Sequence, residues 1–191
     1  MIVRLSIAAL LALGGMQMWA QADRRPLSSR YQADSLAPYV PSPQMVVDKM
    51  LESAQLKPGE TLFDLGCGDG RIPITAAKDF KIKGVCVEIS DELVKAARDN
   101  IKRQGLGGSV SVVHGNLLQV DLKPADIVTL YLLTDSNEKL KPLLETSLKS
   151  GARVVSHDFK MRGWKPDHID TVDVNGRTHT IFVYRMPPKK D

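Results

Sequence analysis

The segment Thr61-Leu-Phe-Asp-Leu-Gly-Cys-Gly-Asp-Gly-Arg71 decides the fold. Its first half is apolar and stops at a glycine, which is typical of a buried parallel strand entering a tight turn. Three glycines follow at alternate positions: Gly66, Gly68 and Gly70. Glycine tolerates positive φ and lets a ligand lie against the backbone. A helical pattern begins at Arg71, so the free N–H groups of its first turn are expected to face that ligand.

Two acids accompany this turn. Asp64 ends the predicted strand, and Glu88 ends a second apolar run, Val85-Cys86-Val87. The third glycine comes one residue too early for a dinucleotide motif, and a carboxylate at Asp64 would repel a pyrophosphate but suit a cationic ligand. Glu88 is placed to accept both hydroxyls of a ribose. Together these features predict an S-adenosylmethionine (SAM) site rather than an ordinary tight turn.

Length and composition indicate one folded domain. The chain has 191 residues, and 43% of them are hydrophobic and 25% charged, as in ordinary globular proteins. The net charge of +4 comes without a dense Lys/Arg block, which favours a solvated basic surface over a nucleic-acid partner. The two cysteines make neither a metal site nor a disulfide framework. We expect free thiols, with Cys67 near the ligand and Cys86 in the core, and no metal.

The residue pattern at the N-terminus predicts a targeting segment. Residues 1–22 combine Arg4, an apolar stretch and Ala20-Gln21-Ala22, as in a signal peptide or N-terminal anchor, and the apolar run is short for a transmembrane helix. The domain would then be exported (periplasmic or secreted) or attached to a membrane. A cytoplasmic location stays open because SAM is made and held there. Residues 23–37 are predicted to be a linker.

The remaining chain alternates between strand and helix patterns. Strands are expected at 61–65, 83–89, 110–114, 127–133 and 152–156, and helices at 44–55, 72–80, 90–104 and 136–148, with Ser42 as N-cap of the first helix. This order predicts right-handed βαβ units and a parallel sheet. Residues 170–174, Asn175-Gly176 and 177–184 predict a closing hairpin. We therefore expect an α/β fold, a Rossmann-like seven-stranded methyltransferase sheet with a C-terminal antiparallel hairpin. The domain would span 38–186, with a tail at 187–191.

Five segments narrow the prediction from a SAM-binding protein to one family of methyltransferases. They are Pro38-Tyr-Val-Pro-Ser-Pro43, Asp64-Leu-Gly-Cys-Gly-Asp-Gly-Arg71, Thr129-Leu-Tyr-Leu-Leu133, Val154-Val-Ser-His-Asp-Phe159 and Gly176-Arg-Thr-His-Thr180. With them the chain resembles the class I SAM-dependent protein-lysine methyltransferases, in particular the group of the ATP synthase c-subunit methyltransferase and its archaeal and bacterial relatives. The resemblance covers about Pro38 to Met186. It implies a protein substrate that bears the target lysine.

The resemblance also implies roles for individual residues. Asp64 and the glycine turn, Gly66, Cys67, Gly68 and Gly70, would hold the methionine part of SAM, and Glu88 would hold the ribose. Asn116 and Leu117 would frame the adenine, although many relatives have aspartate at the position of Asn116. Tyr39 and Ser42 would close over the methionine end; threonine is the expected residue at 42. Tyr131 ends the fourth strand, where such enzymes meet the acceptor amine.

The expected chemistry is an in-line displacement at the methyl group, for which alignment supplies much of the rate. An acceptor lysine with a pKa near 10.4 is neutral in only about one molecule in a thousand at pH 7. Burial beside a cation lowers that pKa, so aromatic walls at Tyr39 and Tyr131 could suffice without a base. If a catalytic base removes the lysine proton, the best candidates are His157 and Asp158. The alternative is that this pair has only a structural role and fixes the loop after the fifth strand. His168, His179 and Trp164 are expected to be structural, or in the case of the histidines exposed.

Three alternatives remain at this point. A methyltransferase acting on a small molecule or nucleic acid would share the cofactor half, but the chain reads Tyr131-Leu-Leu-Thr134 where amino-group methylases of bases carry Asn-Pro-Pro-Tyr. A non-catalytic SAM-binding module is opposed by the presence of both Asp64 and Glu88. A nicotinamide dehydrogenase is opposed by the glycine spacing and the terminal hairpin.

Overall fold

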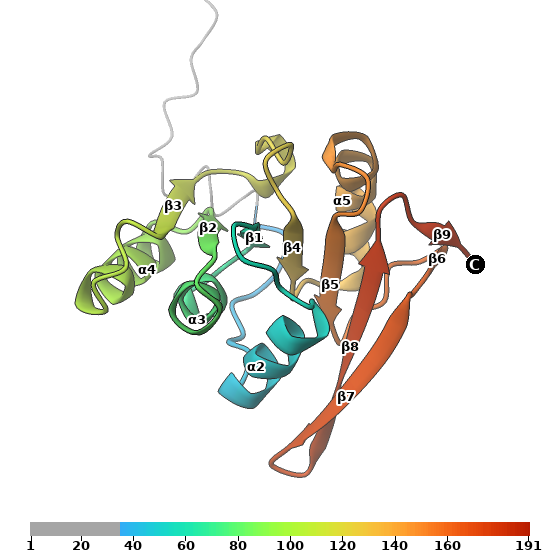
Figure 1. The fold of residues 1–191 in the computed structure, drawn as a ribbon, viewed down its shortest axis with the longest axis horizontal. Coiled ribbons are helices and arrows are strands. Elements are labelled where there is room, and N and C mark those ends of the chain that lie inside the picture. The colour runs from blue at the N-terminus through green and yellow to red at the C-terminus, as the bar shows by residue number, and fades with distance from the viewer. Residues whose placement is uncertain (1–34) are drawn as a thin grey trace, which may run out of the picture.

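The computed structural model describes residues 35–191, which form one α/β domain around a sheet of seven strands (Figure 1). The predicted signal or anchor at 1–22 and nearly all of the predicted linker lie outside the described residues. The strands of the sheet are β1 (Thr61–Leu65), β2 (Lys83–Glu88), β3 (Val110–His114), β4 (Ile127–Leu130), β5 (Arg153–His157), β7 (His168–Val174) and β8 (Arg177–Arg185).

The order of strands across the sheet is β3-β2-β1-β4-β5-β8-β7. Strands β1 to β5 pair in parallel, β8 pairs antiparallel with β5, and β7 pairs antiparallel with β8. The chain therefore reverses direction in strand order between β1 and β4, where ligands bind in open α/β sheets. This arrangement confirms the predicted seven-stranded methyltransferase sheet with its C-terminal hairpin.

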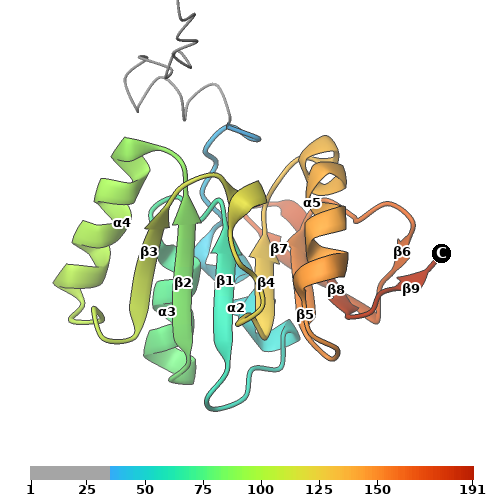
Figure 2. The same cartoon turned by 90° about the horizontal axis from the view of Figure 1, so that it is seen from above.

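Helices cover both faces of the sheet (Figure 2). They are α2 (Gln44–Ser53), α3 (Arg71–Phe80), α4 (Asp91–Arg103) and α5 (Thr134–Ser147), with the short 3-10 helix η1 (Leu117–Gln119) after β3. Helices α2 and α3 pack on one face and α5 on the other, while α4 lies against β2 and β3. Two layers of helices on a parallel sheet bury both of its faces, as βαβ connections require.

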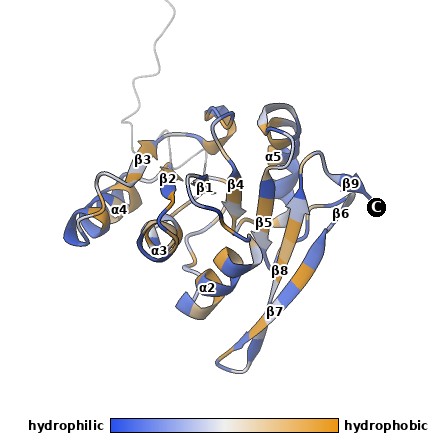
Figure 3. Cartoon of the chain, in the orientation of Figure 1, coloured by the Kyte–Doolittle hydropathy of each residue, from blue (hydrophilic) through white to orange (hydrophobic). Residues whose placement is uncertain are grey.

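The alternation of side chains along the strands divides the core in two. In β1, Leu62 packs towards α2 and α3, whereas Phe63 and Leu65 pack towards α5; in β5, Val155 and Val154 divide in the same way. Each fully buried aliphatic side chain stabilises the fold by about 1.5–3 kcal/mol. The edge strand β7 instead alternates half-buried and exposed residues, and it carries both hydrophilic and hydrophobic side chains along its length (Figure 3).

Close packing between α3 and β2 explains why residue 84 of β2 is glycine. A Cβ on Gly84 would lie 2.7 Å from Cβ of Pro73 in the first turn of α3, so α3 approaches β2 more closely than a larger residue would allow.

Two details differ from the sequence predictions. Strand β4 ends at Leu130 instead of 133, which leaves Tyr131 in the loop. The predicted tail contains β9 (Lys189–Lys190), which pairs with β6 (Trp164–Lys165); pairs this short carry no periodicity in sequence. In the part of the chain that the structure describes, no helix is long and apolar enough to cross a membrane.

Candidate active site

The turn between β1 and α3 is the centre of the site. Its three glycines all have left-handed backbones, with φ of 82° at Gly66, 56° at Gly68 and 81° at Gly70. The N–H groups of Gly66 and Cys67 donate to the carbonyl of Val87 at 2.8 and 3.1 Å. The turn is thus fastened to the end of β2, and α3 begins directly behind it.

Asp64 lies beneath a cavity at the carboxyl ends of β1 and β4. Its side chain is buried, at 3% exposure, and it accepts a hydrogen bond from the Thr129 hydroxyl at 2.8 Å. Burial raises the pKa of Asp64 to about 7, although the Thr129 bond opposes this rise. A positive charge nearby would favour the ionised form, so this acid suits a cationic ligand.

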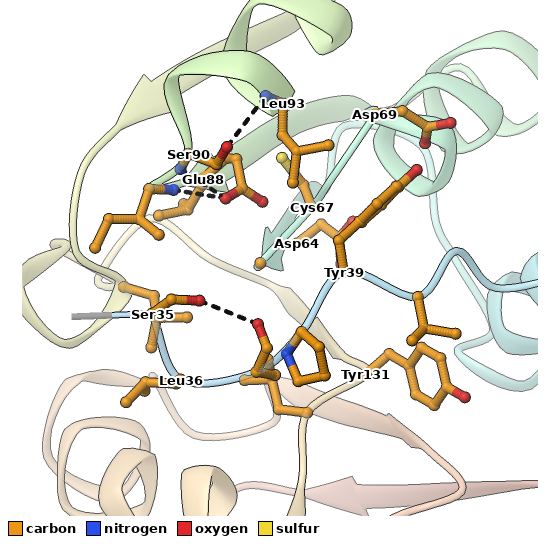
Figure 4. Close-up of a pocket in the computed structure, with 18 of the residues that line it drawn as sticks. Ser35, Leu36, Tyr39, Asp64, Cys67, Asp69, Glu88, Ser90, Leu93 and Tyr131 are labelled. Atoms are coloured by element: carbon orange, nitrogen blue, oxygen red, sulfur yellow. Dashed lines mark hydrogen bonds between the residues drawn. The ribbon is translucent and has the colours of Figure 1, made fainter. Parts of the chain in front are cut away.

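The Glu88 carboxylate organises the other side of the turn. Its Oε2 accepts from the N–H of Gly68 at 2.9 Å, and Oε1 accepts from the N–H groups of Ile89 and Ser90 at 2.8 and 2.9 Å. A carboxylate offers about four lone-pair sites, so Glu88 can take a further donor while keeping these three amides. It faces the cavity together with Ser90 (Figure 4).

The structure corrects the prediction for the cysteines. Cys67 in the glycine turn and Cys86 in β2 form a disulfide, with their Cα atoms 5.2 Å apart, and the chain has no other cysteine. The prediction of free thiols is wrong because it treated the two residues as separate in space. The parallel pairing of β1 with β2, with Asp64 opposite Cys86, brings them together.

Residues 35–43, called here the N-terminal strap, cover the cavity (Figure 4). The carbonyl of Leu36 accepts a hydrogen bond from the hydroxyl of Ser136 at the start of α5. The carbonyl of Ser42 accepts one from Arg71 Nη1 at 2.7 Å, and Asp69 holds the same guanidinium at 2.7 and 3.0 Å. The strap is therefore fixed at both ends, to α5 and to α3.

Tyr39 in the middle of the strap lies on the glycine turn. A Cβ on Gly68 would be 2.3 Å from Cε2 of Tyr39, so only glycine leaves space for this ring. Tyr39 is about half exposed and forms one wall of the cavity. Gly68 is thus explained by the ring that covers it as well as by its backbone.

The cavity has a volume of about 430 Å³, within the usual range of small-molecule sites. Most of the predicted site residues line it: Tyr39, Ser42, Asp64, Gly66, Cys67, Glu88, Asn116, Leu117 and Tyr131. Four others, Gly68, Gly70, His157 and Asp158, are not among the lining residues. Gly70 instead packs on α4, where an added Cβ would be 3.3 Å from Cβ of Ala97.

At the far end of the cavity, Asn116 caps η1. Its Oδ1 accepts a hydrogen bond from the N–H of Leu118 at 2.9 Å, and Leu117 lies beside it in the wall. This loop follows β3, so the three parallel strands β1, β2 and β3 each contribute one group of lining residues at the same edge of the sheet.

Ser42 has a different partner from the one expected. Helix α2 begins at Gln44 with Pro43 as N-cap, and no side chain caps it. The Ser42 hydroxyl lies 3.0 Å from Nδ1 of His157. The N-cap prediction is wrong because a fully buried imidazole nitrogen needs a polar partner, and Ser42 supplies it.

His157 lies directly behind the cavity wall. It is fully buried, and its ring stacks on Tyr131 with centroids 3.8 Å apart. Burial lowers the pKa of His157 to about 4, against the opposing effect of Asp158. Its imidazole is therefore neutral at pH 7 and contacts two lining residues of the cavity, Ser42 and Tyr131.

His179 is buried, not exposed, and completes this group. Its Nδ1 lies 2.8 Å from Nε2 of His157 and 3.2 Å from Oδ2 of Asp158. His179, a residue of β8, therefore links His157 to Asp158, whose own atoms Nε2 and Oδ2 lie 3.4 Å apart. The segment Gly176-Arg-Thr-His-Thr180 marked His179 in the sequence as a residue of interest. The sequence did not reveal that β8 pairs with β5, which brings His179 next to His157.

Trp164 is a packing residue, as expected. It is fully buried, packs edge-on against Tyr184, and its Nε1 donates to Glu145 at 2.9 Å. Other contributors were missed: Thr129 beneath Asp64 and the Asp69–Arg71 pair that holds the strap. Only the spatial neighbours of these residues reveal their contribution.

The fold and the site define a class I SAM-dependent methyltransferase, since an acid at the end of β1, a glycine turn and an acid at the end of β2 surround one cavity. Comparison with known proteins gives the family. Residues 64–168 match the model of the ANTKMT methyltransferase domain, and the chain belongs to this family.

Three relatives illustrate the similarity. A protein-lysine N-methyltransferase of Saccharolobus islandicus (strain REY15A) is 51% identical over 148 residues, covering 77% of this chain and 92% of the relative. The ATP synthase c-subunit lysine N-methyltransferase of Rattus norvegicus is 31% identical over 174 residues, covering 91% and 78%. A crystal structure described as an RNA methyltransferase from Salinibacter ruber, in complex with S-adenosyl-L-homocysteine, is 45% identical with a TM-score of 0.73, covering 80% of this chain and 97% of that chain.

Proposed function

We propose that this protein transfers methyl groups from SAM to the ε-amine of lysine in a protein substrate. The observation that carries the proposal is one cavity that joins a cofactor half to an acceptor half. The cofactor half comprises the glycine turn with Asp64, Glu88 and the Asn116–Leu117 loop; the acceptor half comprises Ser42, Tyr131 and the histidines behind them. The 51% identity to a protein-lysine methyltransferase supports lysine as the acceptor.

The cofactor half fits SAM by its chemistry. Asp64 is a buried acid whose pKa of about 7 would fall beside the ammonium of the methionine part. Glu88 retains acceptor capacity for ribose hydroxyls, and Asn116 with Leu117 lies where the adenine would be framed. When bound, SAM supplies an electrophilic methyl group on a cationic sulfur.

The acceptor half holds and orients the amine. Tyr131 and Tyr39 line the cavity, and aromatic faces attract a cationic lysine on entry. Once enclosed beside a second cation, the lysine loses its proton more readily because burial and like charge both lower its pKa. The strap then excludes water, and alignment of the amine with the methyl group supplies much of the rate.

The test uses the full chain, methyl-labelled SAM and a lysate of the source cell, divided into protease-treated and nuclease-treated portions. Label recovered as methyl-lysine after hydrolysis of protein supports the proposal. Glu88→Ala should abolish it, whereas Glu52→Ala, an exposed change on α2, should not. Label that resists protease but is removed by nuclease would replace lysine with RNA as the acceptor, the substrate named for the Salinibacter ruber relative. No label despite SAM binding would point to a small-molecule acceptor or a binding module.

We further propose that residues 1–22 direct export or membrane attachment. The Arg4 n-region and the Ala20-Gln21-Ala22 site support this, and so does the Cys67–Cys86 disulfide, since disulfides are rare in reducing cytosol. Fractionation of the source cell, with the N-terminal residue of the mature protein determined by mass spectrometry, tests the proposal. An uncleaved, fully cytoplasmic protein would contradict it.

A further inference from the structure

A line of four polar side chains runs from the cavity wall to the outer part of the sheet. Ser42 Oγ lies 3.0 Å from His157 Nδ1, and His157 Nε2 lies 2.8 Å from His179 Nδ1. Asp158 Oδ2 follows, 3.2 Å from His179 Nδ1 and 3.4 Å from His157 Nε2. Ser42 and both histidines are buried, whereas the Asp158 side chain is 13% exposed.

The hydrogen positions on this line are tightly constrained. The facing nitrogens of His157 and His179 are too close for both to carry a proton, so one donates to the other. Asp158 is held as an acceptor, because Oδ1 takes the N–H of Thr180 at 2.9 Å and Oδ2 takes Arg177 Nη2 at 2.8 Å. His157 takes part in the line through both ring nitrogens, so it can accept a proton at Nδ1 and give one up from Nε2, whereas His179 accepts and donates through Nδ1.

The proposed reaction needs such a path. The incoming lysine must lose a proton, and each transfer to a neutral amine produces a methylammonium, which must lose another proton before it can accept a second methyl group. The substrate itself fills the entrance of the cavity during that time, and the strap covers the remainder. A second transfer without release of the substrate therefore requires an exit for protons through the protein.

We propose that Ser42, His157, His179 and Asp158 form this exit and allow more than one methyl transfer in each binding event. This inference rests on the proposed function. A proton leaves the acceptor nitrogen for Ser42 Oγ as the Ser42 hydroxyl proton moves to His157 Nδ1. The Nε2 proton of His157 moves to His179 Nδ1 and from there to Oδ2 of Asp158, which releases it to solvent. Only N–H and O–H bonds form and break.

The surroundings of His157 fit a residue that passes a proton on. The charged or titratable groups that face it are Asp158, His179 and Arg177, and Tyr131 and Ser42 contribute neutral polar groups. Burial, which lowers the pKa of His157 to about 4, prevents the imidazole from retaining the proton at neutral pH. Ser42 is the member that touches substrate, and the other three are positioning and transfer residues behind it.

A metal ion is the competing occupant of this place. Nε2 of His157, Nδ1 of His179 and Oδ2 of Asp158 all lie within 4.8 Å of one another. Arg177 already supplies a positive charge at 2.8 Å to the same carboxylate oxygen. A divalent cation there would face this guanidinium in a buried site, so the geometry favours a mobile proton.

The experiment measures the ratio of mono-, di- and trimethyl-lysine formed by the full chain in lysate protein between pH 6.5 and 9. The test variant is His179→Asn, whose amide can occupy the position of Nδ1 but cannot relay a proton. At pH 9 we expect His179→Asn to form monomethyl-lysine within about threefold of the wild-type rate. At pH 7 we expect its yield of di- plus trimethyl-lysine to fall about tenfold, and to recover as the pH rises. The matched control is His168→Asn, on β7 and outside the line.

Ser42→Ala and Ser42→Thr separate proton transfer from folding. Threonine keeps the hydroxyl and should restore multiple methylation, whereas alanine should not, with thermal unfolding and SAM affinity measured for both. Three results would overturn the inference: wild-type product that is monomethyl-lysine alone, an unchanged product ratio in His179→Asn, or one metal ion per chain by elemental analysis. Absence of methyl-lysine from every reaction would instead contradict the proposed function.

Discussion

The proposed cofactor half of the cavity is built from neighbouring segments of the chain, whereas the proposed acceptor half is assembled from distant ones. Asp64 and Glu88 lie at the carboxyl ends of β1 and β2, and Asn116 follows β3; these three consecutive strands pair side by side. Ser42 and His157 meet across 115 positions of sequence, and His179 joins them only through the hairpin. The cofactor half is also cross-linked by the Cys67–Cys86 disulfide.

This contrast has a physical consequence. Backbone amides and a covalent bond hold the cofactor half, so its geometry depends on the sheet itself. The acceptor half depends on side chains, on the strap and on the Arg71 and Ser136 contacts that fix it. Changes in the cofactor half should therefore affect SAM affinity and stability together, while changes in the acceptor half should affect product formation first.

The largest effect is expected from Glu88→Ala. The change leaves the N–H groups of Gly68, Ile89 and Ser90 without their acceptor, and each buried unpaired donor costs about 1–3 kcal/mol. We expect SAM affinity to fall more than about a hundredfold, on the same energies, with a lower melting temperature. Calorimetric titration and thermal unfolding measure both; Glu88→Gln, which keeps one acceptor oxygen, should lie between. Unchanged SAM affinity in Glu88→Ala would contradict the assignment.

Removal of the disulfide should affect stability more than catalysis. Its closed loop spans 19 residues, for which chain entropy predicts about 3 kcal/mol of stabilisation. Denaturant unfolding of the Cys67→Ala/Cys86→Ala double variant, compared with wild type under oxidising and reducing conditions, measures the loss. The wild type under reducing conditions should approach the variant. Equal stability of all four samples would show that the cross-link does not support the cofactor half.

Gly68→Ala tests the contact between the two halves. The added Cβ would collide with the Tyr39 ring at 2.3 Å and displace one wall of the cavity. Loss of an aromatic contact costs about 0.5–1.5 kcal/mol, so we expect SAM affinity to fall by about two- to twelvefold. Gly59→Ala is the matched control, because Gly59 also has positive φ but no atom within 4 Å. If both variants lose the same affinity, backbone strain and not Tyr39 explains Gly68.

The last test concerns the pH dependence of SAM binding. Asp64 has a pKa raised to about 7 and must be ionised to face a cationic ligand, so SAM affinity should fall by about tenfold per pH unit as pH drops below 7. Thr129→Val removes the bond that opposes the rise. The midpoint should then move upward by about one pH unit, whereas Thr129→Ser should leave it in place. A midpoint that does not move in Thr129→Val would show that another group controls binding.

The outcome of the sequence predictions follows the same division. The parallel sheet, the hairpin and the place of Asp64 and Glu88 in the cavity wall were predictable from the residues, because strand ends of a parallel sheet meet at one edge. The place of Asn116 and Leu117 in that wall was implied by the family resemblance. The roles of Ser42 and His179 and the state of the two cysteines were not predictable. Each depends on a partner that lies in another strand or loop.

The sequence by itself therefore determined the class of fold and the place of Asp64, Glu88 and the glycine turn at one edge of the sheet, through the alternation of strands and helices, the spacing of three glycines and two acids at strand ends. Tertiary structure alone decided that Cys67 meets Cys86, that Tyr39 occupies the space above Gly68, and that Ser42, His157 and His179 form one line. The reason is that local patterns record how a segment folds and which face it buries, whereas a side-chain contact between remote segments exists only once the sheet has set their register.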